Sequence, residues 1–75
     1  MTVDPDEPTP LYEQVAAILR GRIGSGDLTG RVPSIMAIAQ EFGVAKGTAE
    51  RALAILRDEG LITVVIGRGA FVKRQ

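Results

Sequence analysis

The fold is decided by residues 33–60, which read PSIMAIAQEFGVAKGTAERALAILRDEG. The proline–serine pair at residues 33–34 is typical of a helix start, with the serine hydroxyl as the N-cap. Gly43 suits the left-handed residue that ends such a helix. A further helical pattern covers about residues 46–59, and Gly60 is well placed to end it. Two helices joined by a turn of about four residues that contains glycine form a helix-turn-helix.

Apolar residues repeat at helical spacing in both segments, which predicts one buried face on each helix. On the first segment this face consists of Ile35, Ile38, Ala39 and Phe42. On the second it consists of Ala49, Ala52, Leu53 and Leu56. Arg51 projects roughly opposite the second face, so we expect it to be exposed.

An earlier helix is predicted over about residues 10–23, with Thr9 as its N-cap and Pro10 as its first helical residue. The sequence Gly-Ser-Gly at residues 24–26 is expected to stop it. Its apolar stripe consists of Leu11, Val15, Ile18, Leu19 and Ile23. The preceding residues are acidic and proline-rich. We therefore expect a disordered acidic leader over residues 1–9 and one folded domain over residues 10–75.

After Gly60 the pattern changes to that of a β-hairpin. Residues 61–66 are rich in β-branched side chains, and residues 70–73 contain an aromatic and a β-branched residue. The segment Gly67-Arg68-Gly69 lies between them as a glycine-flanked tip. The predicted fold is therefore mainly α with a small β-hairpin: a winged helix-turn-helix of three helices plus a two-stranded wing.

Length and composition exclude several classes of protein. The chain has 75 residues, enough for one domain, and it contains neither cysteine nor histidine. It therefore lacks thiolate metal sites and the commonest general base, and we expect no enzyme, no metal site and no cofactor. No apolar run approaches the roughly 18 residues of a membrane span, and the N-terminus does not resemble a secretory signal. We expect a cytoplasmic protein with no membrane partner.

Charge is unevenly distributed along the chain. The formal net charge is zero, but the first ten residues hold three acids and no base. Residues 11–75 carry nine basic and six acidic side chains, a net charge of +3. This balance permits binding to DNA without requiring it.

Seven short blocks occur in one order over about residues 10–72. They are Leu11-Tyr12-Glu13-Gln14-Val15, Ser25-Gly26-Asp27-Leu28, Val32-Pro33-Ser34, Phe42-Gly43-Val44, Arg51-Ala52-Leu53, Asp58-Glu59-Gly60-Leu61-Ile62 and Gly67-Arg68-Gly69-Ala70-Phe71-Val72. In this order the chain resembles the GntR family of bacterial transcription regulators. No single block is specific, but seven in register make the resemblance strong.

The resemblance implies a regulator, more often a repressor, that binds a specific double-stranded DNA operator as a homodimer. The third helix would enter the major groove, and the wing would approach the minor groove or the neighbouring backbone. The residues expected to contact DNA are Ser34, Met36, Lys46, Gly47, Thr48, Glu50, Arg51, Gly67, Arg68 and Gly69. Arg68 is the leading candidate, because its glycine neighbours do not hold the backbone away.

Several of these residues also have a plain structural interpretation. Ser34 is first a helix cap, Gly47 could mark a frayed first turn, and Thr48 could be a solvated threonine. The chain also departs from the family pattern at two places, with Met36 and Glu50 where arginines are usual. Glu50 could accept a hydrogen bond from cytosine or form a salt bridge with Lys46 four residues earlier. The family's site preference therefore does not carry over.

Two alternative functions remain open from the sequence. A winged helix can serve as a protein-interaction adaptor, and Glu50 with the neutral overall charge favours this slightly. It can also be an architectural DNA-binding protein without sequence preference. Residues 64–66 are three consecutive apolar residues that cannot all face inward on a ribbon, so they are a candidate dimer contact. Tyr12 is expected in the core or in a dimer contact.

Family members usually carry a larger C-terminal domain that binds a metabolite and holds the dimer together. The chain is expected to be either a DNA-binding fragment or a minimal regulator. A small-molecule effector is expected only if such a domain is missing here.

Overall fold

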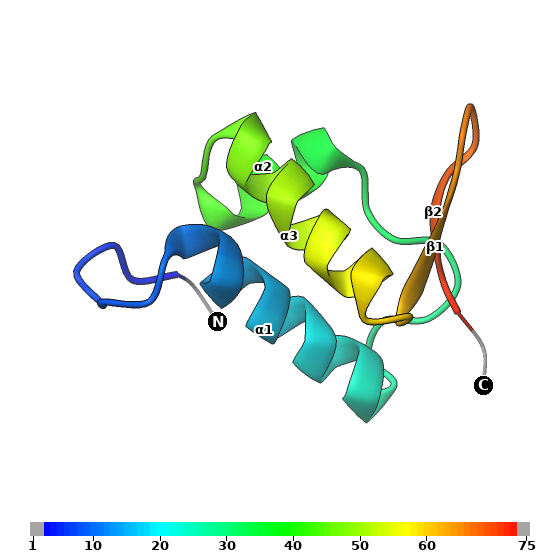
Figure 1. Ribbon diagram of the computed structural model, residues 1–75, viewed down its shortest axis with the longest axis horizontal. Helices are drawn as coiled ribbons and strands as arrows, with labels where there is room; N and C mark the ends of the chain where they lie inside the picture. Colours follow the sequence, from blue (N-terminus) through cyan, green and yellow to red (C-terminus); the bar gives the residue numbers. More distant parts are fainter. Residues whose placement is uncertain (1–2, 74–75) are drawn as a thin grey trace.

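The computed structural model describes residues 3–73; residues 1–2 and 74–75, the outer ends of the predicted leader and domain, lie outside the described residues. Three helices precede one hairpin: α1 (Leu11–Ser25), α2 (Ile35–Phe42), α3 (Lys46–Asp58), β1 (Ile62–Val65) and β2 (Gly69–Val72). Figure 1 shows α3 between α1 and α2, with the hairpin projecting beside the far end of α3. The predicted fold class is confirmed.

The core lies where α3 packs against the other two helices. All four residues of the predicted inward face of α3 are buried, namely Ala49, Ala52, Leu53 and Leu56. The largest fully buried side chains are Leu19, Ile38, Leu56 and Val15. Ile62 and Ala70 extend this core into the base of the hairpin.

Side-chain and backbone caps set the ends of α1 and α2. The Ser34 hydroxyl accepts a hydrogen bond from the Ala37 backbone N–H at 3.1 Å, as predicted for an N-cap. The prediction for α1 is wrong by one residue, because Pro10 and not Thr9 occupies the N-cap position. Pro10 has an extended ψ of 147°, while its carbonyl already accepts from the N–H groups of Glu13 and Gln14 in the helix. The helix also ends at Ser25, two residues later than predicted.

The described part of the acidic segment lies against the start of α1. The side-chain oxygen of Gln14 accepts from the Asp4 N–H at 2.7 Å, and its amide nitrogen donates to the carbonyls of Asp4 and Thr9 at 2.9 and 2.8 Å. Gln14 is buried, and Val3 packs against the core. The structure thus gives this segment partners that the expectation of a disordered leader did not include.

The hairpin is antiparallel, and a third short segment lies along β2. Ile62 pairs with Val72 at its base and Val65 with Gly69 near its tip. The Val32 N–H donates to the Ala70 carbonyl at 2.8 Å, and Arg31 forms a bridge with Phe71. The connection before α2 therefore fixes the hairpin to the helices, which the sequence analysis did not predict. No helix within residues 3–73 has the length and apolar character to cross a bilayer.

Candidate nucleic-acid interface

One exposed strip runs along α3 opposite its buried face. It consists of Gly47, Glu50, Arg51 and Ala54, which follow one another at the three- and four-residue spacing of a single helix face. The first three are exposed and Ala54 is half-buried. We call these four residues the outer strip of α3. It is the part of the helix that can meet a partner without disturbing the core.

The start of α3 is electropositive and lacks a side-chain cap. Its N-cap residue is Ala45, which has no side chain able to accept from the first-turn N–H groups. Lys46 is exposed at the first helical position, where the helix dipole is already positive. Thr48 is half-buried, so only part of it can contact a ligand. The N-terminus of α3 thus suits an anion such as a phosphate.

Among the residues that the structure describes, Glu50 forms no ion pair. Within residues 3–73 the ion pairs are Arg20–Glu59, Arg22–Glu41 and Arg57–Asp58. The alternative salt bridge between Lys46 and Glu50 is therefore not formed among the described residues. The Glu50 carboxylate remains available in the outer strip.

Arg51 makes a contact that the sequence analysis missed. Its guanidinium lies over the ring of Tyr12, 4.3 Å from the centroid, and so joins α3 to the first turn of α1. A guanidinium stacked on a ring face keeps its N–H donors free at its edge. Tyr12 therefore holds Arg51 toward the α1 side of the outer strip, and the arginine stays exposed.

The hairpin tip requires its two glycines. The Arg68 N–H donates to the Val65 carbonyl at 3.0 Å and closes a tight turn. Gly67 has φ of 80° and Gly69 φ of 104°, a region that side chains disfavour. Arg68 is exposed between them. All three residues lie where the sequence analysis expected them, at the end of the hairpin.

Arg31 supports this tip and was not among the predicted site residues. Its guanidinium donates to the Arg68 carbonyl at 3.2 Å. A Cβ placed on Gly69 would lie 3.5 Å from the same guanidinium, in ordinary van der Waals contact. Arg31 is 37 residues from Arg68 in sequence, so no local pattern could reveal the contact.

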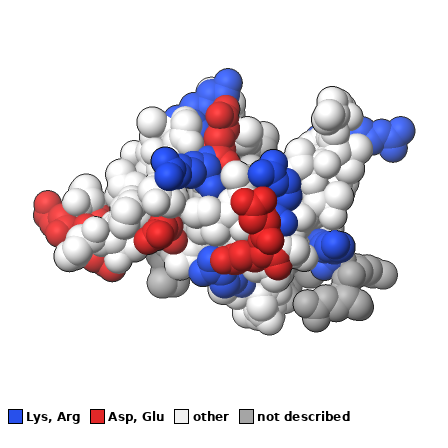
Figure 2. Space-filling model, in the orientation of Figure 1, with Lys and Arg blue, Asp and Glu red and all other residues white. Residues whose placement is uncertain are grey.

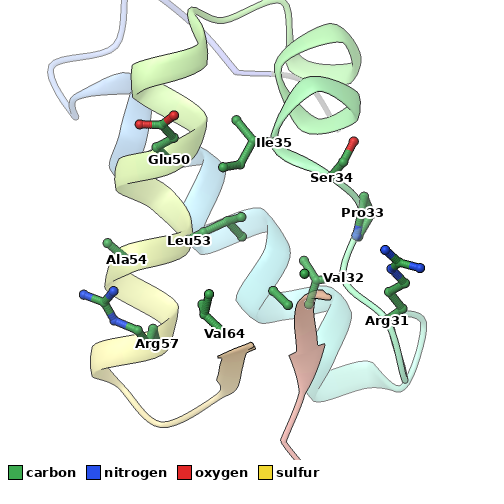
Figure 3. A pocket seen from close by; sticks show the side chains of 12 residues that line it. Arg31, Val32, Pro33, Ser34, Ile35, Glu50, Leu53, Ala54, Arg57 and Val64 are labelled. Atoms are coloured by element: carbon green, nitrogen blue, oxygen red, sulfur yellow. The ribbon is translucent and has the colours of Figure 1, made fainter. Parts of the chain in front are cut away.

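A groove of about 360 Å³ lies between α3, the start of α2 and the hairpin. Val32, Leu53 and Val64 lie between its two walls (Figure 3). Figure 3 shows one wall formed by Glu50, Ala54 and Arg57 and the other by Arg31, Pro33 and Ser34. Two predicted residues thus line the same depression, Ser34 from the N-cap of α2 and Glu50 from α3.

Apolar side chains dominate the rest of the exposed hairpin. Val64 and Val65 are exposed, and Ile66 is 98% exposed at the tip. Met36 on α2 is exposed as well. In Figure 2 most of the visible hairpin surface is uncharged, and acidic side chains cover the N-terminal segment at the opposite end of the molecule. The hairpin and the acidic segment therefore lie at opposite ends of the molecule.

A capped α2, an α3 with an exposed outer strip and a glycine-tipped hairpin define a winged helix-turn-helix domain. Residues 11–72 match the family described as "Bacterial regulatory proteins, gntR family". The chain belongs to the GntR family. This is a family of regulatory proteins, which agrees with the expectation that the chain is not an enzyme.

Known relatives support this membership. The chain is 45% identical over 67 residues to an HTH-type transcriptional regulator of Rhizobium meliloti (strain 1021), covering 87% of this chain and 28% of that protein. It is 34% identical over 76 residues to the HTH-type transcriptional repressor NagR of Bacillus subtilis (strain 168), covering 99% of this chain and 31% of that protein. It thus spans about three tenths of the length of these relatives.

The fold is also that of a DNA-binding domain solved on its operator. The structure of AraR(DBD) in complex with operator ORX1 superposes with a TM-score of 0.87 at 28% identity, covering 97% of this chain and 95% of that chain. The likeness extends over the helices and the hairpin together, because nearly the whole of both chains is covered.

Proposed function

We propose that this chain is a sequence-specific double-stranded DNA-binding domain of a transcription regulator, and that the regulator acts as a repressor. The observation that carries the proposal is the arrangement of α3: its inner face is buried while its outer strip is exposed next to an uncapped, electropositive helix start. AraR(DBD), which shares the fold, is solved with an operator, and NagR is a repressor.

In the proposed complex α3 lies in the major groove and the hairpin tip lies over the adjacent backbone or minor groove. Arg68 supplies the cation at the tip, with Arg31 holding its carbonyl. Lys46 and the free N–H groups at the start of α3 bind phosphate. Ser34 and Met36 approach from α2, and Thr48, Gly47 and Arg51 from α3. The proposed mechanism of repression is occlusion of promoter DNA.

The proposal includes a homodimer and a cytoplasmic location, and it includes a small-molecule effector only if a longer protein adds a C-terminal domain to this chain. Dimerisation follows from the two-fold symmetry of operators that helix-turn-helix proteins read. Within the described residues the exposed run of residues 64–66 is a candidate contact. The chain spans about three tenths of the length of its curated relatives, so the homodimer, the location and the effector are proposed for the whole regulator.

A protein-interaction adaptor is the second candidate, favoured by Ile66 at the hairpin tip and by the zero net charge. Salt dependence separates the two. Binding to DNA weakens steeply as salt rises, because each neutralised phosphate releases counterions, whereas an apolar protein contact does not weaken in this way.

The test is a selection of random duplexes by the purified 75-residue chain, followed by titration of the enriched duplex at several salt concentrations. We expect one enriched motif and a logarithmic salt slope of about −0.9 for each phosphate contact. A scrambled duplex of equal length is the control. Equal affinity for both duplexes would indicate an architectural protein, and no binding in dilute buffer would overturn the proposal.

A further inference from the structure

Glu50 is the only acid in the outer strip of α3, and its neighbours leave it unobstructed. Gly47 precedes it by one turn, and a Cβ placed on Gly47 would meet nothing within 4 Å. Ala54 follows it by one turn and ends at Cβ. No packing among the described residues therefore explains the glycine, which costs up to about 1 kcal/mol of helix stability relative to alanine. The small residues instead let a flat surface come close to the Glu50 carboxylate.

The cations near Glu50 form no ion pair with it among the described residues. Arg51 is stacked on Tyr12, and Arg57 donates to Asp58 at 3.3 and 3.4 Å. Lys46 makes no ion pair within the described residues. This carboxylate accepts no hydrogen bond from a side chain within residues 3–73, so it suits a partner that presents a hydrogen-bond donor.

Duplex DNA offers few such donors. Its phosphates repel a carboxylate, and in the major groove guanine presents N7 and O6 acceptors and thymine an O4 acceptor. Only cytosine N4 and adenine N6 donate there, and adenine also places its N7 acceptor beside N6. Cytosine is therefore the base edge that a carboxylate tolerates best.

We infer that Glu50 is a specificity-determining residue that reads one cytosine in each half of the operator, by accepting a hydrogen bond from its N4 amino group. This inference rests on the proposed function, since it requires α3 in the major groove. The same inference explains the small side chains at residues 47 and 54. Gly47 and Ala54 allow the backbone of α3 to approach the bases on both sides of the carboxylate.

The test is parallel selection from one random-duplex pool by the wild-type chain and by Glu50→Gln and Glu50→Ala. We expect wild type to enrich a cytosine at one position per half-site by about tenfold over the other bases. Glu50→Gln should shift that position to adenine, because a glutamine amide pairs with adenine N6 and N7 together. Glu50→Ala should lose the preference there and retain the rest of the motif.

Glu13→Gln is the matched control. It removes the same charge from an exposed position in the first turn of α1, so it reproduces any general gain in affinity without touching the outer strip. Its motif should equal that of wild type. Circular dichroism of each variant checks that the fold is kept, as expected for a substitution at an exposed residue.

The two failures are distinguishable. If wild type enriches no motif, sequence-specific binding itself is overturned. If wild type enriches a motif that Glu50→Gln and Glu50→Ala leave unchanged at every position, the proposed function stands and the role of Glu50 is overturned. A cytosine-to-adenine shift confined to Glu50→Gln would support the inference.

Discussion

The two faces of α3 have the same helical period but opposite chemistry. The residues of the inner face are apolar and at most 7% exposed, whereas the outer strip consists of two small and two charged residues, of which only Ala54 is half-buried. Charged residues on α1 and α3 also differ in whether they are paired. Arg20 and Arg22 on α1 each form an ion pair with a carboxylate, while Lys46 and Glu50 on α3 form none within the described residues. One helix thus separates residues that stabilise the fold from residues free to bind a partner.

The largest expected effect comes from the inner face. Leu56 is fully buried, so Leu56→Ala removes packing and leaves a cavity. We expect a loss of about 2–5 kcal/mol in the free energy of unfolding, enough to unfold much of a small domain. Urea denaturation followed by circular dichroism measures it. Ala54→Gly on the outer strip is the comparison and should cost only about 1 kcal/mol. Equal losses would remove the distinction between the two faces.

Arg68→Ala should change binding without changing stability. Arg68 is exposed, and only its backbone is used within the hairpin. We expect duplex affinity to fall about tenfold and the logarithmic salt slope to decrease in magnitude by about one, with the melting temperature nearly unchanged. Fluorescence anisotropy and thermal melting give the two quantities.

Arg20→Ala is the control for Arg68→Ala, because it removes the same charge from α1, where Arg20 is paired with Glu59. Its effect on affinity should be much smaller. A melting temperature that falls together with affinity in Arg68→Ala would make Arg68 a structural residue.

A smaller effect is expected at Tyr12 of α1, which contacts Arg51 of the outer strip. Tyr12→Leu keeps apolar bulk but removes the ring beneath Arg51. An exposed cation–π contact contributes about 0.5–1 kcal/mol, so we expect duplex affinity to fall about two- to fivefold. Tyr12→Phe keeps the ring and should bind like wild type. If leucine and phenylalanine at this position bind equally, the ring does not position Arg51 for DNA.

Local sequence patterns were sufficient for the helices, the hairpin and the N-cap at Ser34. The inner face of α3 could be predicted because Ala49, Ala52, Leu53 and Leu56 are spaced by the helix period, which depends on neighbouring residues alone. The glycine-flanked tip could be predicted because positive φ demands glycine at particular places in a turn.

Contacts between distant residues could not be predicted in this way. Arg31 meets the hairpin tip and Arg51 meets Tyr12 only after the chain has folded, and no spacing along the sequence encodes either contact. The Gln14 side chain likewise forms hydrogen bonds with the backbone N–H and carbonyl of Asp4, ten residues earlier in the sequence. The DNA contacts of the ten predicted site residues stay predictions, because the structure fixes their positions and not their ligand.

The smallest expected effect is on the free energy of unfolding, and it concerns the ion pairs Arg22–Glu41 and Arg20–Glu59, whose residues are paired whereas Glu50 of the outer strip is unpaired among the described residues. A hydrogen bond from Arg22 lowers the pKa of Glu41 below its ordinary value of 4.5, and Arg20 lowers the pKa of Glu59 in the same way. A carboxyl whose pKa is lower in the folded state stabilises the fold above about pH 4.5, and this contribution is lost as pH falls through the lowered value.

Because both side chains of the Arg22–Glu41 pair are partly exposed, we expect it to contribute only about 0.2–1 kcal/mol. Urea denaturation of wild type and Glu41→Gln at pH 7 and at pH 3 measures it. The difference between the two proteins should be present at pH 7 and shrink toward pH 3, and added salt should reduce it. A difference that is the same at both pH values would mean that Glu41 acts through packing beside Phe42, over which Arg22 also lies, and not through its charge.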